Sequence, residues 1–129
     1  MRSIVLLSEN PVDLLRAQDD LRRLSECEAH LTSAVCMVVE RRDDLMTVLV
    51  DDDILNDYDG SELEACGVDW MRVHLAALSF RRLGLLSDVL VVCRPQLGAA
   101  WLDNDHGVIL PADDALADLP GFMARDSSE

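Results

Sequence analysis

Residues 32–51, TSAVCMVVERRDDLMTVLVD, contain the clearest structural signal in the sequence. Thr32–Glu40 and Leu45–Asp51 are both rich in β-branched residues, which are typical of strands. Residues 41–44 (RRDD) between them are polar, and their number suits a hairpin loop. We therefore predict two antiparallel strands joined by this loop.

The first strand of this hairpin is apolar on both of its faces. Every residue of the stretch 34–39 (AVCMVV) is apolar, although alternate side chains of a strand point to opposite sides of the sheet. Such a strand is either central and covered on both sides, or has one face in a subunit interface. The sequence leaves both alternatives open.

The N-terminal residues predict a strand followed by an amphipathic helix. Residues 3–8 are mostly apolar and predict a strand that ends before Asn10-Pro11. Asn10 can cap a helix that begins at Pro11, because proline lacks an N–H that would be unpaired at that position. The apolar residues that then recur at helical spacing are Leu14, Ala17, Leu21 and Leu24.

The middle of the chain predicts two helices and a strand. Ser61–Glu64 has the pattern of a capping box, and Gly67 can end that short helix. Asp69 can cap a second helix over Trp70–Leu83, closed by glycine, whose apolar residues cover most of its circumference and indicate burial. Asp88–Cys93 is rich in valine and predicts a further strand.

The C-terminal third predicts a hairpin and a short helix. Ala99–Leu102 and Val108–Leu110 are expected to pair around residues 103–107 (DNDHG), since these residue types favour a tight turn. Asp113 can cap a last helix that continues through Leu119 and is stopped by Pro120-Gly121.

The expected element order is β-α-β-β-α-β, followed by a hairpin and a short C-terminal helix. This order indicates one α+β domain over residues 1–123, with helices packed on one face of a mainly antiparallel sheet. We expect residues 124–129 to be a disordered tail. A ferredoxin-like core fits this order. If the first strand is only an arm, the order resembles the roadblock/LC7 layout of small regulatory dimers; that resemblance implies a fold and transfers no residues.

The composition limits the class of partner. The chain has 129 residues, and 50% of them are hydrophobic, which is enough for one core. Its 25 acidic residues against 11 arginines, with no lysine, give a formal net charge of -14. Nucleic-acid phosphates and anionic lipids bind basic surfaces. We therefore expect no direct nucleic-acid binding and no membrane binding.

The sequence also indicates a compartment. No apolar run approaches the roughly 18–20 residues that span a bilayer, and the N-terminus lacks the pattern of a signal peptide. The cysteines, Cys27, Cys36, Cys66 and Cys93, include no CxxC pair. We expect reduced thiols in a cytoplasmic protein, and the use of arginine without lysine is consistent with GC-rich bacterial coding.

The excess negative charge is concentrated in residues 51–69, which carry eight carboxylates and no basic residue. Residues 57–60 (DYDG) resemble part of a calcium loop, but an EF-hand alignment would place Leu55 and Cys66 where oxygen ligands are needed. An irregular Mg²⁺ or Ca²⁺ site, a solvated loop and a surface for a basic partner are the alternatives. We favour the partner surface, because so many unneutralised carboxylates repel one another.

The other reactive residues form no recognisable catalytic or metal motif. Cys27-x-x-His30 is half of a zinc pattern and has no second half. The sequence has no nucleophile elbow and no lysine for a phosphate-binding loop. His74 and Arg81 would share one side of the helix predicted over residues 70–83, where they line a small anion pocket or reach solvent. We expect no enzyme, no cofactor and no metal.

These observations predict a non-catalytic acidic module that binds and occludes a basic protein, as an immunity protein, an antitoxin-like inhibitor or an export chaperone does. Tyr58, expected to be exposed, would anchor the contact. The residues expected to touch the partner are Asp51, Asp53, Asp57, Tyr58, Asp59, Glu62 and Glu64. Two alternatives are a homodimeric ligand-responsive or scaffolding regulator that pairs through its sheet, and a metal-dependent enzyme that uses the aspartates.

Overall fold

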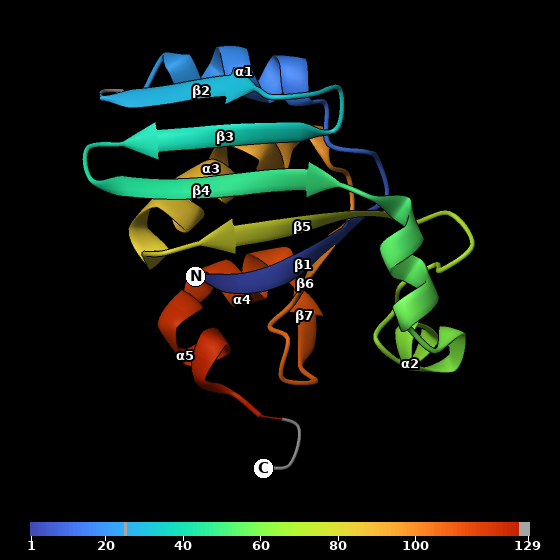
Figure 1. The fold of residues 1–129 in the computed structure, drawn as a ribbon. Helices are drawn as coiled ribbons and strands as arrows, with labels where there is room; N and C mark the ends of the chain where they lie inside the picture. Colours follow the sequence, from blue (N-terminus) through green and yellow to red (C-terminus); the bar gives the residue numbers. More distant parts are fainter. Residues whose placement is uncertain (25, 127–129) are drawn as a thin grey trace.

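A computed structural model, which describes residues 1–24 and 26–126, contains a seven-stranded antiparallel sheet (Figure 1). The strands are β1 (Arg2–Ser8), β2 (Cys27–Leu31), β3 (Cys36–Arg41), β4 (Asp44–Val50), β5 (His74–Phe80), β6 (Ala100–Asp103) and β7 (Ile109–Pro111). Their order across the sheet is β2-β3-β4-β5-β1-β6-β7. The α+β class and the antiparallel sheet are confirmed, and the ferredoxin-like and roadblock-like layouts stay predictions.

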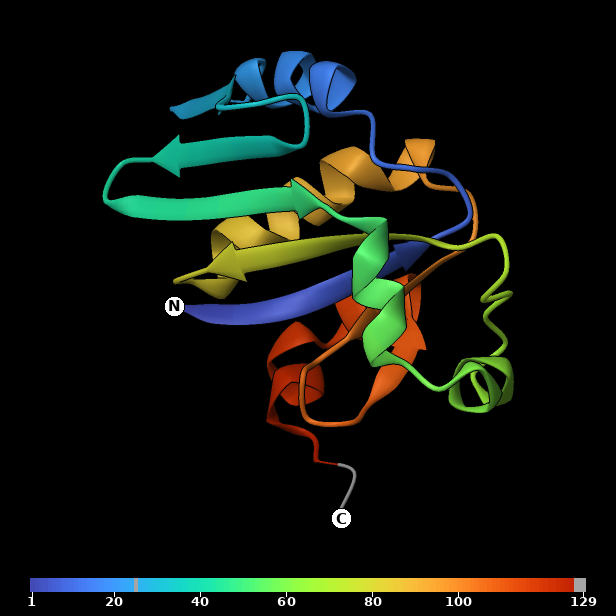
Figure 2. The ribbon, with the colours of Figure 1, turned by 45° about the vertical axis from the view of Figure 1, so that its right-hand side comes forward.

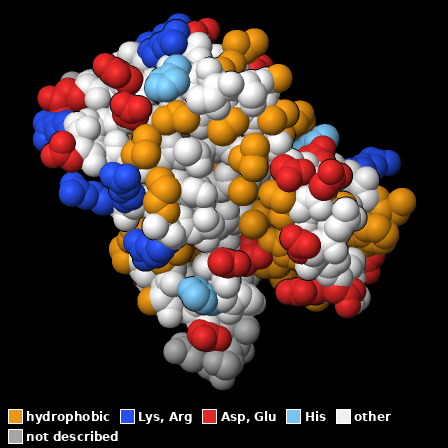
Figure 3. Space-filling model, viewed as in Figure 1, with side chains coloured by type: hydrophobic (Ala, Val, Ile, Leu, Met, Phe, Trp, Pro, Cys, Tyr) orange, Lys and Arg blue, Asp and Glu red, His pale blue; other side chains and the backbone are white. Residues whose placement is uncertain are grey.

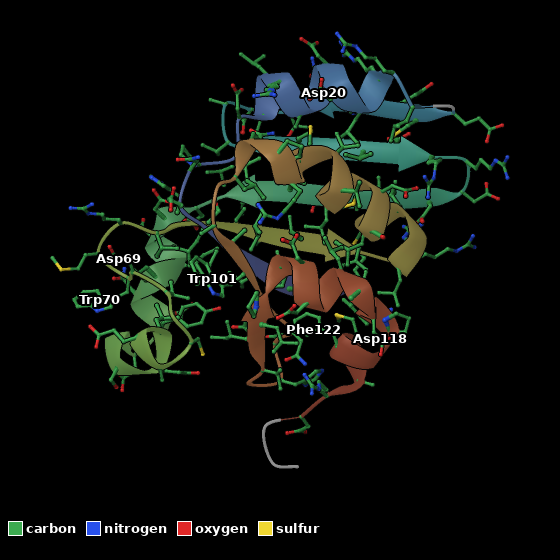
Figure 4. The ribbon with its side chains drawn as sticks, turned by 180° about the vertical axis from the view of Figure 1, so that it is seen from behind. Asp20, Asp69, Trp70, Trp101, Asp118 and Phe122 are labelled. Carbon is green, nitrogen blue, oxygen red and sulfur yellow. The ribbon has the colours of Figure 1, made fainter. Side chains whose placement is uncertain are left out.

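Helices pack on both faces of this sheet, but unequally. The face seen from behind in Figure 4 carries α1 (Leu14–Arg22), α3 (Leu83–Cys93), α4 (Ala112–Ala117) and α5 (Leu119–Ala124), and the main core lies beneath them. On the opposite face, the 3-10 helix η1 (Asp52–Asp57) and helix α2 (Gly60–Ala65) cover only one end of the sheet (Figure 2). A further 3-10 turn, η2, spans Arg94–Gln96.

Strand β5 replaces the helix that we predicted over Trp70–Leu83, so that prediction was wrong. It has buried side chains on both faces of the sheet: Leu75 packs in a second, smaller core, Leu78 and Phe80 pack in the main core, and Ala77 and Ser79 are partly exposed. A strand covered on both faces has a nearly continuous apolar sequence, which periodicity alone does not distinguish from a buried helix. Asp69 begins a turn instead of a helix, and its carboxylate accepts a hydrogen bond from the Met71 amide at 3.3 Å.

Helix α3 replaces the strand that we predicted over Asp88–Cys93, and it includes Gly84, where we expected a helix to end. Its buried residues recur at helical spacing: Leu85, Leu86, Val89, Leu90 and Cys93. The valines suggested a strand, but β-propensity is weaker than the burial pattern of a whole segment. Together, these two errors exchanged a strand and a helix in the predicted order.

Helices α1 and α2 begin at residues other than the predicted ones. Helix α1 is capped by Asp13, whose carboxylate accepts a hydrogen bond from the Arg16 amide at 3.2 Å, rather than by Asn10. Helix α2 is capped by Asp59, and Ser61 lies inside its first turn. In both helices an aspartate close to the predicted cap takes that role, because its carboxylate accepts a hydrogen bond from a free amide of the first turn.

The two C-terminal helices also differ from the prediction. Helix α4 begins at Ala112, so Asp113 lies in its first turn instead of capping it. Pro120 and Gly121 do not stop a helix but lie in the first turn of α5, where a proline is tolerated. Helix α5 includes Ala124, which we expected in the tail; residues 127–129 of that expected tail lie outside the described residues.

Both predicted hairpins are confirmed, with adjusted limits. The strand expected over Thr32–Glu40 begins only at Cys36, as β3, because residues 32–35 form a turn; β2 (Cys27–Leu31), which precedes this turn, was not predicted. In the β3–β4 hairpin Arg41 pairs with Asp44, and the turn contains Arg42 at a φ of 55°. In the β6–β7 hairpin the buried side chain of Asn104 accepts hydrogen bonds from two amides of the turn, at 2.8 and 3.2 Å.

Substitutions in α3 provide a test of the strand-to-helix correction. Leu86→Ala removes a side chain that is fully buried in the main core, so we expect the free energy of unfolding to fall by about 2–5 kcal/mol. Val91→Ala, on the exposed side of the same helix, should change it by less than about 0.5 kcal/mol. Urea unfolding followed by circular dichroism measures both, and equal losses in the two variants would contradict a helix with this orientation.

Candidate functional site

The seven residues predicted to contact a partner lie together on one projection of the molecule. We call residues 51–73 the acidic lobe; it consists of η1, α2 and the segment 66–73 that leads into β5. Figure 1 shows it at one end of the sheet, and Figure 3 shows carboxylates over much of its surface. Asp51 and Tyr58 are partly buried, and the other five predicted residues are exposed.

A second core packs the acidic lobe onto the sheet. Leu63, Val68 and Val73 of the lobe are buried against Leu7 of β1 and Leu75 of β5. Trp101 of β6, labelled in Figure 4, packs against the edge of this core. The carboxylates therefore stand on a packed scaffold whose geometry is set by buried apolar contacts.

Asp52 attaches the start of the lobe to strand β5. Its Oδ1 accepts a hydrogen bond from the Leu75 amide at 3.1 Å, and its Oδ2 lies 3.1 Å from His74 Nδ1. The sequence analysis did not single out this residue from its neighbours. His74 and Arg81 do not form the anion pocket that we considered, because they lie at opposite ends of β5.

Two of the predicted contact residues also shape the lobe. Asp51 caps η1 through the Asp53 amide at 3.0 Å, and Asp59 caps α2 through the Ser61 amide at 2.9 Å. The hydroxyl and then the amide of Ser61 lower the pKa of Asp59 by hydrogen bonding to its carboxylate. The aspartates near η1 and α2 are thus used in helix caps, which explains part of their spacing in the sequence.

Tyr58 is not the exposed anchor that we expected. Its ring is partly buried against the second core, and its hydroxyl donates a hydrogen bond to the carboxylate of Asp103 on β6. Burial of the ring and, secondly, the neighbouring Asp103 raise the pKa of Tyr58 well above its ordinary value. Tyr58 therefore connects the lobe to β6 and presents only part of its ring to solvent.

The exposed apolar side chains of the lobe are Trp70 and Met71, which the sequence analysis had assigned to a buried helix. Trp70 is 37% exposed and Met71 is 78% exposed. The indole Nε1 of Trp70 donates a hydrogen bond to Glu64 Oε1 at 2.9 Å. A Cβ on Gly60 would lie 3.0 Å from the indole, so the glycine allows the ring to lie directly against α2 (Figure 4).

A groove of about 450 Å³ lies between η1, α2 and the indole ring. Leu55 and Leu63 supply apolar lining, and Tyr58 and Trp70 supply aromatic lining. The carboxylate-bearing residues that line it are Asp59 and Glu64. This combination suits a side chain with an apolar stem and a cationic head, because aromatic rings and carboxylates both attract arginine and lysine.

The described residues contain no group of three or more His, Cys, Asp or Glu side chains placed to hold a metal ion. Cys27 and His30, the half zinc pattern, lie on opposite faces of β2, since Cys27 is buried and His30 is exposed. The thiols of all four cysteines are free. Burial raises the pKa of the Cys93 thiol to about 11, and it also raises the pKa of the Cys27 and Cys66 thiols.

Comparisons with known proteins give no further guide to this site: no family model, curated protein or solved structure matches the chain. None of the described helices is long and apolar enough to cross a membrane. The interpretation of the acidic lobe therefore depends on its own geometry and charge.

The raised pKa of Tyr58 predicts that its hydroxyl ionises only at strongly alkaline pH. Because the chain has one tyrosine, any tyrosinate absorbance comes from Tyr58. A pKa raised above the ordinary 10.0 stabilises the fold below about pH 10, and this stabilisation is lost as the pH rises further. We expect tyrosinate absorbance in the folded protein to appear only above the ordinary range, and Tyr58→Phe to abolish it. Asp103→Asn should lower the pKa only part of the way, because burial is the larger cause. Ionisation of the Tyr58 hydroxyl near pH 10 in the folded protein would contradict this environment.

Proposed function

We propose that the protein is a non-catalytic module that binds and occludes a basic partner protein through its acidic lobe. The observation that supports this proposal is a packed projection that carries unneutralised carboxylates beside an exposed indole. Several exposed carboxylates without local counter-ions repel one another and reduce the stability of the isolated protein. A cationic partner would neutralise these carboxylates and remove that repulsion, so binding such a partner would stabilise the lobe.

The charges of the lobe support this proposal in detail. Asp53, Asp57 and Glu62 have no cationic partner among residues 1–24 and 26–126. The lobe contains one arginine, Arg72. Its Nε lies 3.9 Å from Asp69 Oδ2, and both side chains are largely exposed. The described arginines outside the lobe form ion pairs with carboxylates outside the lobe or none at all. A basic partner would therefore meet carboxylates that are free to bind.

The proposed mechanism is electrostatic attraction followed by occlusion. The acidic lobe draws a basic surface towards itself, which raises the association rate at low salt. An arginine or lysine of the partner then enters the groove beside Trp70, where its head meets Asp59 and Glu64. Around this anchor the lobe covers the basic surface. Immunity proteins, antitoxin-like inhibitors and export chaperones in the cytoplasm are the kinds of protein that this mechanism describes.

Charge reversal on the lobe tests the electrostatic step. We expect the immobilised protein to capture a basic protein from a lysate of its source organism at low salt, and to release it as salt rises. Asp57→Arg/Glu62→Arg should abolish this capture, because both side chains are exposed and neither caps a helix. The matched control is Asp19→Arg/Asp114→Arg, which changes the net charge equally on exposed positions of α1 and α4.

The control decides what a loss of capture means. Loss in both double variants would show that only net charge matters and would remove the lobe from the proposal. Unchanged capture by Asp57→Arg/Glu62→Arg would contradict the proposed mechanism directly.

Substitution of Trp70 tests the anchor separately from the charge. Trp70→Ala removes the indole from the groove, and we expect the dissociation rate of the captured partner to rise by at least about 30-fold, as for an aromatic hot spot. The association rate and its dependence on salt should change little, because the carboxylates remain. Val91→Ala, another exposed apolar residue, is the control on α3. Surface plasmon resonance with the captured protein measures both rates; equal effects of the two substitutions would refute an anchoring role.

A further inference from the structure

An apolar groove lies between the start of α1 and the turn that joins β2 to β3. Its volume is about 340 Å³. We call it the α1 groove, and seven residues line it: Val12, Asp13, Leu14, Leu15, Leu31, Ala34 and Val50. Asp13 carries the one charge among these lining residues, and none of them is basic.

The α1 groove reaches from solvent to the main core. Leu14 is buried in that core, and Leu31 and Val50 pack against its edge. In contrast, Leu15 at the rim is 64% exposed, and Val35, which follows Ala34 in the turn, is 48% exposed. Exposed apolar side chains around an apolar groove are typical of binding surfaces. The groove therefore suits an apolar side chain of another molecule.

Hydrogen bonds fix the walls of the α1 groove. The Leu31 amide donates to Gln18 Oε1 at 3.0 Å, which joins the end of β2 to α1. The Val50 amide donates to the carbonyl oxygen of Val35 at 2.8 Å, which joins the end of β4 to the β2–β3 turn. An occupant would therefore bind to a preformed groove, and little conformational entropy would be lost in ordering these elements.

The α1 groove and the acidic lobe lie at the same end of the sheet. Val50, the last residue of β4, lines the groove, and Asp51, the first residue of the lobe, follows it directly. Figures 1 and 2 show the β2–β3 turn and η1 at this end of the strands. Figure 3 shows apolar side chains on the surface above the carboxylates of the lobe. One segment of a partner can therefore contact both places.

The charges around the α1 groove are negative. Asp19 follows Leu15 by one helical turn and lies on the same side of α1. Asp13 and Asp19 are exposed and form no ion pair within the described part of the chain. Arg16, in contrast, pairs with Asp20 (Nε to Oδ2, 3.8 Å). These charges attract a basic segment, whereas a second copy of this chain, with a net charge of -14, is repelled.

We propose that the α1 groove binds a large apolar side chain of the same basic partner whose cations meet the acidic lobe. The partner then presents a segment in which leucine or a similar residue lies close to arginines or lysines. Attraction to the lobe weakens as salt rises, whereas burial of the apolar side chain does not depend on charge. This inference rests on the function proposed above, from which it takes the basic partner. It adds an apolar determinant to the recognition of that partner.

Two synthetic peptides test this inference on the full chain. One peptide alternates arginine with leucine, and the other has the same length and charge but has serine in place of every leucine. Isothermal titration calorimetry should give a dissociation constant at least about 10-fold lower for the leucine peptide, as expected when one leucine side chain is buried. Asp57→Arg/Glu62→Arg should weaken the binding of both peptides, because the lobe attracts their common charge.

A substitution in the groove and a matched control locate the apolar contact. Leu15→Asn should remove most of the preference for the leucine peptide and leave the binding of the serine peptide unchanged. Val91→Asn, on the 58% exposed Val91 of α3, should keep the preference. Both side chains are exposed, so we expect both variants to fold, which circular dichroism verifies. In methyl NMR spectra of the wild type, the leucine peptide should shift the signals of Leu31, Ala34 and Val50.

The outcomes distinguish the groove from the lobe. Equal dissociation constants for the two peptides would overturn the inference, and the function proposed for the lobe would stand if Asp57→Arg/Glu62→Arg still weakened both. A preference for leucine that survives Leu15→Asn, or that Val91→Asn removes equally, would also overturn the inference. Peptide binding that does not change in Asp57→Arg/Glu62→Arg would instead contradict the proposed role of the lobe. If neither peptide binds, both proposals fail. Loss of the preference in Leu15→Asn alone would support the groove.

Discussion

The burial of strand β5, in the main core on one face and at Leu75 on the other, is the constraint on which the rest of this structure depends. Leu78 and Phe80 point into the main core, and Leu75 points into the second core beneath the acidic lobe. Strand β5 pairs with β4 on one side and β1 on the other, so it joins the β2-β3-β4 half of the sheet to the β1-β6-β7 half. The lobe inherits its position from the same strand, since its last residues lead directly into His74. A change in this strand would therefore alter fold and site together.

The acidic lobe shows how local stability and surface charge are balanced. Repulsion among its carboxylates is opposed by the buried contacts of Leu63, Val68 and Val73 and by aspartates that cap η1 and α2. Asp52 adds hydrogen bonds to the first residues of β5. The carboxylates that remain free are presented outward by a scaffold that does not depend on them. This division of roles is what makes a binding surface physically reasonable in such a charged segment.

Patterns that depend on near neighbours in the sequence identified much of the lobe. The charge of residues 51–69 indicated the surface, and the run DNDHG at residues 103–107 correctly indicated a turn. The exposure of individual side chains was harder to predict from the sequence, because it depends on contacts with residues far away along the chain. Tyr58 is partly buried because Asp103 and the second core come from other strands. Trp70 lies on the outside of α2, where Gly60 leaves room for the ring and Glu64 accepts a hydrogen bond from its indole N–H.

By itself, the sequence determined the α+β class, the antiparallel hairpins and the place of the negative charge, because short-range patterns of burial, turn residues and carboxylates carry that information. Only the tertiary structure decided that residues 74–80 form a strand and residues 83–93 a helix. A segment that is apolar on every side satisfies both periods, and the choice is made by the partners that cover it. The tertiary structure likewise decided that the strand containing Val38, apolar on both faces, is covered on one face and open on the other.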